Sequence, residues 1–167
     1  MTEIRDSQPA DADGILRVHV EAFPTSAEAD LVEKLQSDGD DRISLVASVN
    51  DAIVGHILFS RMDVHAEGAA LHAIALAPVA VRSDWQGRGI GSQLIRVGIE
   101  RAKAEGWQII FLLGEPAYYR RFGFTTEAAR PFASPYARAY FQALPVACQG
   151  QPTSGTAEYA RAFAGLG

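Results

Sequence analysis

Three glycines, Gly87, Gly89 and Gly91, stand at alternate positions in the stretch VAVRSDWQGRGIGSQLI, between an apolar run and a long amphipathic segment. Glycine inside a regular element costs roughly 0.5–1 kcal/mol relative to alanine, so its repetition needs a reason. Where a turn leads into a helix, the first N–H groups lack partners and the helix dipole adds positive charge. Glycines there let a phosphate reach the backbone without meeting a Cβ atom. We favour this reason over a turn that only requires positive φ.

The spacing excludes two common nucleotide-binding loops. A dinucleotide fingerprint has the pattern G-x-G-x-x-G, and Ser92 stands where its third glycine belongs. A Walker loop needs four residues between its glycines and then Lys-Ser or Lys-Thr, which this stretch lacks. What remains, Gln86 to Gly91, matches the pattern Q/R-x-x-G-x-G/A.

With that pattern in its context, the sequence resembles the GNAT superfamily of acetyl-CoA-dependent N-acetyltransferases. The context is the apolar strand LAPVAV before the turn and a helix after it. A second block, FLLGEPAYYRRFGF (111–124), is similar to the family's final strand and the short helix behind it. The resemblance is close over residues 70–124 and looser before them. The tail, with AEYARAFAGL, is similar to a poorly characterised subgroup of predicted acetyltransferases.

The resemblance implies where the cosubstrate acetyl-CoA is held. In the family, N–H groups of the turn bind the pyrophosphate, and the main chain of the preceding strand pairs with the pantetheine arm. The guanidinium of Arg88 could contact a phosphate, with a solvated arginine as the alternative. Carried over to this sequence, the cofactor-binding residues are Val79, Ala80, Val81, Gln86, Gly87, Arg88, Gly89, Ile90, Gly91, Ser92 and Gly114.

The implied reaction is attack of a neutral amine on the thioester, through a tetrahedral oxyanion, with expulsion of the coenzyme A thiolate. The family's general acid is the tyrosine four residues before Gly-Phe in this motif, which assigns the role to Tyr119. A phenol, with an ordinary pKa of about 10, stays protonated at neutral pH. Adjacent helical residues point about 100° apart, so we expect only one of Tyr118 and Tyr119 to face the sulfur. The alternative for Tyr119 is a half-buried packing residue.

The sequence leaves the general base open. The apolar stretch ALHAIALAPVAV (70–81) contains no carboxylate, and His72 is its one titratable group. An imidazole with an ordinary pKa near 6.5 can accept a proton, but a lone histidine in an apolar strand is more often a core residue. Glu21 and Glu115 are weaker candidates, and deprotonation through water is an equal alternative.

Hydrophobic periodicity predicts the elements that position these residues. Alternation on either side of Asn50-Asp51 predicts a β-hairpin. A stretch that is apolar on both faces predicts one buried strand over residues 70–81, with a bulge at Pro78. Helices are expected at residues 10–23, 28–36, 89–105 and 116–122, and further strands at residues 2–7, 107–114 and 137–146.

These elements predict a single α/β domain over residues 1–167, long enough for one core. The resemblance implies a mixed, mainly antiparallel central sheet flanked by helices, which opens between the strands near Ala80 and Leu112 to admit acetyl-CoA. The implied acceptor is a primary amine of a small molecule or of a protein. Members of this fold are often dimers, so a homodimer is a family expectation.

Composition disfavours several other classes of protein. A net charge of −5 argues against a sequence-independent nucleic-acid binder. No apolar run reaches the ~18 residues of a membrane helix, and the first residues lack the basic-then-apolar pattern of a secretory signal. With a single cysteine, Cys148, the chain has no internal disulfide framework, and we expect a cytoplasmic protein. His19, His56, His65 and Cys148 show no metal-ligand spacing, so no metal is expected.

Two rival functions remain open. A non-catalytic acyl-CoA-binding or sensor module would keep the cofactor site without turnover. The missing strand carboxylate favours that module, whereas Tyr119 and the GEPAYY segment favour catalysis. An unrelated nucleotide-binding protein would bind ATP or NAD rather than coenzyme A, and it fits the sequence least.

Overall fold

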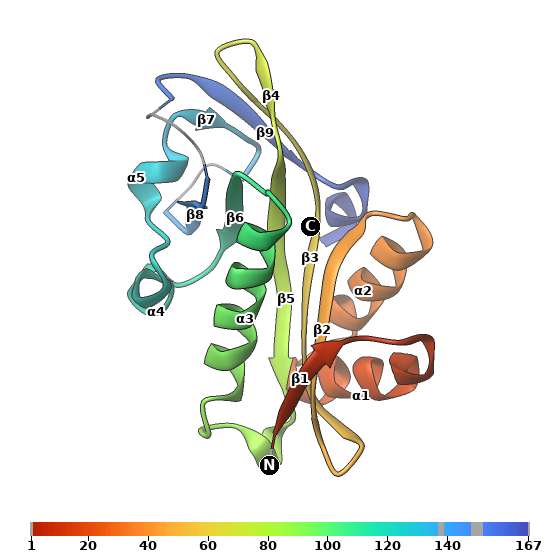
Figure 1. The fold of residues 1–167 in the computed structure, drawn as a ribbon. Coiled ribbons are helices and arrows are strands. Elements are labelled where there is room, and N and C mark those ends of the chain that lie inside the picture. Colours follow the sequence, from red (N-terminus) through yellow and green to blue (C-terminus); the bar gives the residue numbers. More distant parts are fainter. Residues whose placement is uncertain (1, 137–138, 148–151, 167) are drawn as a thin grey trace.

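The computed structural model describes residues 2–136, 139–147 and 152–166. Figure 1 shows a sheet seen nearly edge-on, with helices on both faces. The strands are β1 (Glu3–Asp6), β2 (Asp41–Val49), β3 (Ala52–Ala66), β4 (Ala69–Leu71), β5 (Ala73–Val81), β6 (Ile109–Leu113), β7 (Phe132–Ala133), β8 (Phe141–Pro145) and β9 (Gly155–Tyr159). The α-helices are α1 (Ala12–Ala22), α2 (Ala27–Ser37), α3 (Ile90–Ala104), α4 (Pro116–Tyr119) and α5 (Thr126–Ala129). Short 3₁₀ turns flank them, the last being η4 (Arg161–Leu166).

The main sheet runs in the order β1-β2-β3-β5-β6-β8, with β4 and β9 on the far half of β3 and β7 on β9. Its neighbours pair antiparallel except β5 and β6, which are parallel. The predicted mixed, mainly antiparallel sheet is therefore confirmed. Helix α3 covers one face, whereas α1 and α2 lie across the other (Figure 1).

The sheet opens between β5 and β6. Their pairing runs from Ala73–Ile109 to Ala75–Phe111 and stops there, so β5 has no β6 partner from Leu76 onward. On its other side, β5 stays paired with β3 as far as Val81. The predicted opening between these two strands is present.

A bulge in β5 lies at the start of this opening. Ile57 of β3 pairs with Val79, and Phe59 pairs with Leu76, so β5 has one residue more than β3 over this interval. The extra residue falls at Ala77-Pro78, as the proline predicts, because proline has no N–H to donate to the ladder.

The single strand predicted over residues 70–81 is wrong in one respect. Strand β4 ends at Leu71 and β5 begins at Ala73, with the exposed His72 between them. Strand β3 continues to Ala66 and folds back through a tight turn at Glu67 and Gly68, both with positive φ. The break arises because β4 and β5 pair with different parts of β3. Local hydrophobicity cannot predict this pairing, because the apolar run continues across His72.

Hydrophobic clusters on the two faces of the sheet hold α3 and α2 to it. On the α3 side, Leu94 and Ile95 pack with Ile57 and Phe59. On the other side, Leu31 and Leu35 of α2 pack with Leu58 and with the end of the chain at Phe163. The C-terminal segment thus closes against α2, although the two are far apart in sequence.

Two buried histidines join α1 to the sheet. His19 Nε2 lies 2.8 Å from His56 Nδ1, and His56 Nε2 lies 2.9 Å from Ser44 Oγ, which accepts from Ser7 Oγ at 2.7 Å. Burial lowers the pKa of His19 from 6.5 to about 4 and is the main cause that lowers the pKa of His56. Sequence spacing does not bring these two histidines together.

Part of the predicted strand over residues 137–146, and Cys148, cannot be compared with the structure. Cys148 and residues 137–138 of the predicted strand 137–146 lie outside the described residues, and β8 is the part of that strand seen. Within the described ranges, no three His, Cys, Asp or Glu side chains gather as a metal site. No helix among the described residues has the length and apolar character to cross a membrane.

Candidate active site

Three hollows follow one another along the free edge of β5. The bulge hollow, of about 290 Å³, is lined by Phe23, Glu28, Leu31, Leu76, Ala77, Pro78, Val79, Leu113, Tyr119, Tyr159 and Phe163. The strand hollow, of about 240 Å³, is lined by Ala22, Phe23, Val79, Ala80, Val81, Gln86, Gly91, Ile95 and Tyr118. The turn hollow, of about 300 Å³, is lined by Val81, Trp85, Gln86, Gly87, Gly89, Ile90, Gly91, Ser92 and Tyr118.

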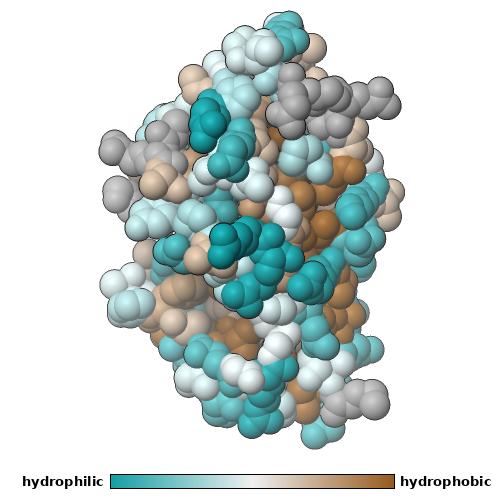
Figure 2. Space-filling view, turned by 90° about the vertical axis from the view of Figure 1, so that its left-hand side faces the viewer, coloured by the Kyte–Doolittle hydropathy of each residue, from teal (hydrophilic) through white to brown (hydrophobic). Residues whose placement is uncertain are grey.

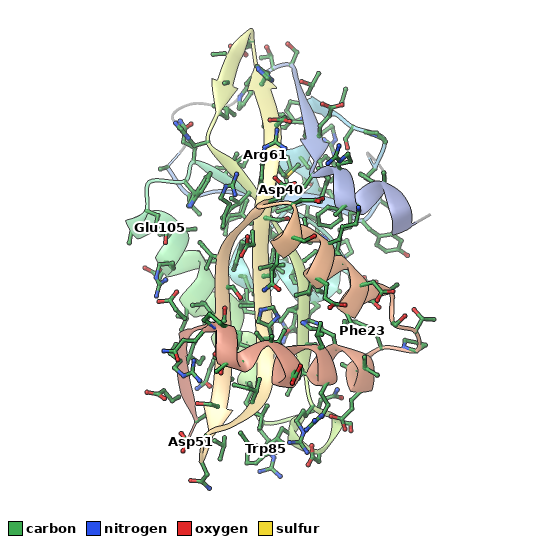
Figure 3. The ribbon with its side chains drawn as sticks, turned by 90° about the vertical axis from the view of Figure 1, so that its right-hand side faces the viewer. Phe23, Asp40, Asp51, Arg61, Trp85 and Glu105 are labelled. Carbon is green, nitrogen blue, oxygen red and sulfur yellow. The ribbon has the colours of Figure 1, made fainter. Side chains whose placement is uncertain are left out.

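Shared walls join the hollows into one run. Phe23 and Val79 line both the bulge hollow and the strand hollow. Val81, Gly91 and Tyr118 are among the walls that the strand hollow shares with the turn hollow. Phe23 lies at the end of α1, above Trp85 in the view of Figure 3. Figure 2 shows the face seen from the side opposite to that of Figure 3, where hydrophobic patches lie between hydrophilic side chains.

The main chain of β5 offers a free edge at Val79 and Val81. Arg82 N donates to Val54 O of β3 at 2.8 Å, and the carbonyl of Ala80 lies beside Gly55 of β3. Main-chain groups alternate between the two sides of a strand, so those of Val79 and Val81 face the opening. On that side, Gln86 Nε2 donates to the carbonyl of Val81 at 2.9 Å. An extended ligand arm laid along this edge would meet Val79 and Val81, with Ala80 turned toward β3.

The glycine turn has a structural reason of its own. Gly87 has φ 77° and Gly89 has φ 80°, a left-handed conformation that side chains rarely adopt. The turn itself therefore requires glycine at these two positions, and the approach of a ligand to their main chain stays a prediction. Gly91 differs, because it sits inside the first turn of α3, where an added Cβ would lie 3.7 Å from Val81 Cγ2, an ordinary contact.

The N-terminus of α3 is open to a ligand. Its N-cap is Gly89, and no side chain caps the helix. The first N–H groups of a helix have no partner within it, and the dipole adds positive charge there. Ile90, Gly91 and Ser92 of this first turn all line the turn hollow. The hollow thus has the donors that an anion requires.

Two guanidinium groups stand beside the turn hollow. Arg88 lies over the ring of Trp85, 4.5 Å from its centroid. Arg121 lies over the ring of Tyr118 at 4.4 Å, and its Nε donates to the Tyr118 carbonyl at 2.8 Å. Trp85 and Tyr118 are walls of the hollow, so both cations are near it although the protein is acidic overall. Arg88 was predicted from the glycine motif, whereas Arg121 lies in the second block (111–124) and was not predicted as a site residue.

The two adjacent tyrosines line different hollows. Tyr119 lines the bulge hollow, whereas Tyr118 lines the strand and turn hollows. Their rings are 4.9 Å apart and nearly perpendicular, at 89°. Burial, with a smaller contribution from Tyr118, raises the pKa of Tyr119 above 10. Tyr119 is therefore a protonated phenol beside the β5 bulge at neutral pH.

Gly114 leaves room for the ring of Tyr119. A Cβ atom built on Gly114 would overlap Cε2 of Tyr119 and lie 2.8 Å from its Cδ2. Its main chain is also held, since Gly114 N donates to Tyr140 O at 3.0 Å and Gln142 Nε2 donates to Gly114 O at 2.8 Å. Gly114 is not among the residues that line the three hollows; it sets the position of the tyrosine that does.

None of the sequence candidates for a base lines these hollows. His72 is exposed and meets the edge of Trp107. Glu21 pairs with Arg82 at 3.6 Å, and Glu115 occupies the N-cap position of α4 without a side-chain capping hydrogen bond. The carboxylate that the structure places in the bulge hollow is Glu28, which the sequence analysis treated only as the start of an amphipathic helix.

The family model described as an acetyltransferase (GNAT) domain matches residues 3–126 of this chain. The chain belongs to the GNAT acetyltransferases. It is therefore an N-acetyltransferase with acetyl-CoA as cosubstrate, which confirms the resemblance noted in the sequence.

Relatives of this GNAT acetyltransferase include two proteins of Escherichia coli K12. The chain is 42% identical over 130 residues to the uncharacterized N-acetyltransferase YjhQ, covering 76% of this chain and 72% of the relative. It is 36% identical over 126 residues to the uncharacterized N-acetyltransferase YhbS, covering 75% and 74%.

Two solved structures of GNAT proteins are similar to the whole fold. A crystal structure of YhbS from Escherichia coli in complex with CoA superimposes with a TM-score of 0.88 at 32% identity, covering 99% of this chain and 93% of the other. A GNAT acetyltransferase from Brucella melitensis in complex with acetyl-CoA gives a TM-score of 0.79 at 34% identity, covering 98% of each chain.

Proposed function

We propose that this acetyltransferase moves an acetyl group from acetyl-CoA to a primary amine, with Tyr119 as the general acid. The observation that carries the proposal is the continuous run of hollows along the free edge of β5. It links the uncapped N-terminus of α3 to the phenol of Tyr119. The CoA and acetyl-CoA complexes of the two similar structures support the same ligand here.

Each hollow has residues suited to one part of acetyl-CoA. In the turn hollow, main-chain N–H groups from Gly87 to Ser92 would hold the pyrophosphate, with the guanidinium of Arg88 nearby. In the strand hollow, the outward main-chain groups of Val79 and the N–H of Val81 would hold the pantetheine arm, since the Val81 carbonyl already accepts from Gln86. The bulge hollow then receives the thioester beside Tyr119.

Tyr119 would act on the leaving group. The amine nitrogen forms a bond to the thioester carbon, the carbon–sulfur bond breaks, and the Tyr119 hydroxyl donates its proton to the departing sulfur. The raised pKa of Tyr119 keeps the phenol protonated at neutral pH, so the proton is available when negative charge develops on the sulfur. The proton lost by the amine nitrogen passes to water, and the Tyr119 phenolate takes up a proton from water, so the products are an amide and the free thiol.

Amine-dependent release of the coenzyme A thiol tests this function. The protein is mixed with acetyl-CoA and a panel of primary amines, and the acetylated product is identified by mass. Thiol release that requires an amine is expected. Binding of acetyl-CoA without turnover on any amine would instead favour the non-catalytic acyl-CoA module.

Ser92→Glu tests the pyrophosphate position. The helix dipole stabilises a carboxylate in the first turn of α3, so the free protein should lose no stability. The same charge would face a bound pyrophosphate, and the Kd for acetyl-CoA should rise about tenfold to a hundredfold at low salt. Titration calorimetry measures the Kd, and Ser92→Gln, of the same size as the Glu variant but uncharged, should bind acetyl-CoA more tightly than Ser92→Glu. Equal affinity of the Glu and Gln variants would place the pyrophosphate elsewhere.

A further inference from the structure

The bulge hollow combines an apolar wall with a single carboxylate. Phe23, Leu31 and Phe163 contribute aromatic and aliphatic surface from α1, α2 and η4. Glu28 is the one charged side chain among the described residues that line this hollow. A ligand here would therefore meet mostly apolar atoms and one negative charge.

The carboxylate of Glu28 is not satisfied by the protein around it. Its Oε1 atom is buried and has no hydrogen-bond partner among the described residues. Glu28 stands in the first turn of α2, where the helix dipole stabilises a negative charge. The dipole does not donate a hydrogen bond to Oε1, which therefore still lacks a donor. Glu28 as a whole is half-buried, so its Oε1 atom lacks a partner while the carboxylate can still meet a ligand, and a cationic ligand would pair with its charge.

A second residue that lines the same hollow carries an unpartnered polar atom. The hydroxyl of Tyr159 is buried and has no hydrogen-bond partner among the described residues. The ring is held between Phe163 at 4.9 Å and Tyr136 at 5.2 Å. Because a phenol both donates and accepts, this hydroxyl can bond an amine. Two residues far apart in the sequence, each with an unpartnered polar atom, thus line one cavity.

We propose that Glu28 selects the acceptor: a primary amine whose ammonium group pairs with Glu28 and the Tyr159 hydroxyl, and whose remaining body is uncharged and apolar. The inference rests on the proposed function, since it names the acceptor class of the same site. No Lys, Arg or His is among the described residues that line the hollow. An acceptor carboxylate would find no cation there and would be repelled by Glu28, so α-amino acids are disfavoured.

A matched pair of amines tests this selection by binding alone. 2-Phenylethylamine and phenylalanine differ by one carboxylate. Calorimetry is carried out with coenzyme A present, so that no turnover is needed. The wild type should bind 2-phenylethylamine at least about tenfold more tightly than phenylalanine. Glu28→Gln should weaken binding of 2-phenylethylamine about tenfold or more and remove the preference.

Glu33→Gln is the matched control, because Glu33 lies on the same helix with its side chain exposed. It should bind both amines as the wild type does. Equal binding of the two amines to the wild type, unchanged binding by Glu28→Gln, or no binding of 2-phenylethylamine at millimolar concentration would each overturn the proposal. Thiol release with acetyl-CoA and 2-phenylethylamine tests the proposed function separately. Glu28-dependent binding without release would contradict catalysis and leave the amine site standing.

Discussion

Tyr119→Phe should lower kcat by about 10²- to 10⁴-fold while leaving the Kd for acetyl-CoA unchanged. The substitution removes the one proton donor that this side chain presents to the bulge hollow. A phenylalanine ring fills the same space against Gly114 and Phe124, so the fold should be kept. Single-turnover rates with a productive amine, together with calorimetric titration of acetyl-CoA, measure the two quantities separately.

Tyr140→Phe is a suitable control for this experiment, since Tyr140 is 56% exposed and lines none of the three hollows. It should leave kcat unchanged. Equal rates for Tyr119→Phe and the wild type would remove Tyr119 from the mechanism. A large loss of acetyl-CoA affinity in Tyr119→Phe would show that the ring holds the cosubstrate rather than donating a proton.

Stability should fall steeply as the pH drops from about 6.5 toward 4, because two histidines are buried in their neutral forms. The unfolded chain takes up protons near pH 6.5, whereas folded His19 resists protonation until about pH 4, so acid favours unfolding. The effect is absent above the unfolded pKa, and His19 alone contributes roughly 3 kcal/mol to the loss. Asp11 opposes the shift at His56 but is itself paired with Arg5 at 2.8 Å.

Urea unfolding at a series of pH values measures this loss. The double substitution His19→Gln/His56→Gln should flatten the profile, because an amide keeps hydrogen-bonding groups and does not take up a proton. His65→Gln should leave the profile unchanged, since His65 is exposed. If the double variant does not fold, NMR titration of the imidazole protons in the wild type gives both pKa values. Ordinary values near 6.5 would contradict the account.

The parts of the fold that local signals determine were predicted well. The positive φ at Asn50 and Asp51 belongs to the predicted hairpin, and α3 begins and ends beside glycines, Gly89 and Gly106, as its pattern indicates. The break at His72 was not predictable in this way. It depends on how a distant half of β3 pairs, and the apolar run continues across it.

The site, like the fold, has residues that local motifs predict and residues that only tertiary packing brings together. The glycine turn and Tyr119 lie in contiguous motifs, so their positions could be inferred from spacing and resemblance. Glu28 and Tyr159 line one hollow only because the end of the chain folds back against α2, and neither has a local pattern that marks it. His19 and His56 come together for the same reason, through the packing of α1 on β3.

A thermal-shift titration with acetyl-CoA tests the central claim most directly, with ATP and NAD as controls. A ligand present at about 100 times its Kd adds roughly 2.7 kcal/mol to the free energy of unfolding, which gives a clear rise in Tm. The account predicts a rise with acetyl-CoA, a smaller rise for Ser92→Glu, and none with ATP or NAD. No rise at millimolar acetyl-CoA would contradict the claim that the run of hollows along β5 holds this cosubstrate.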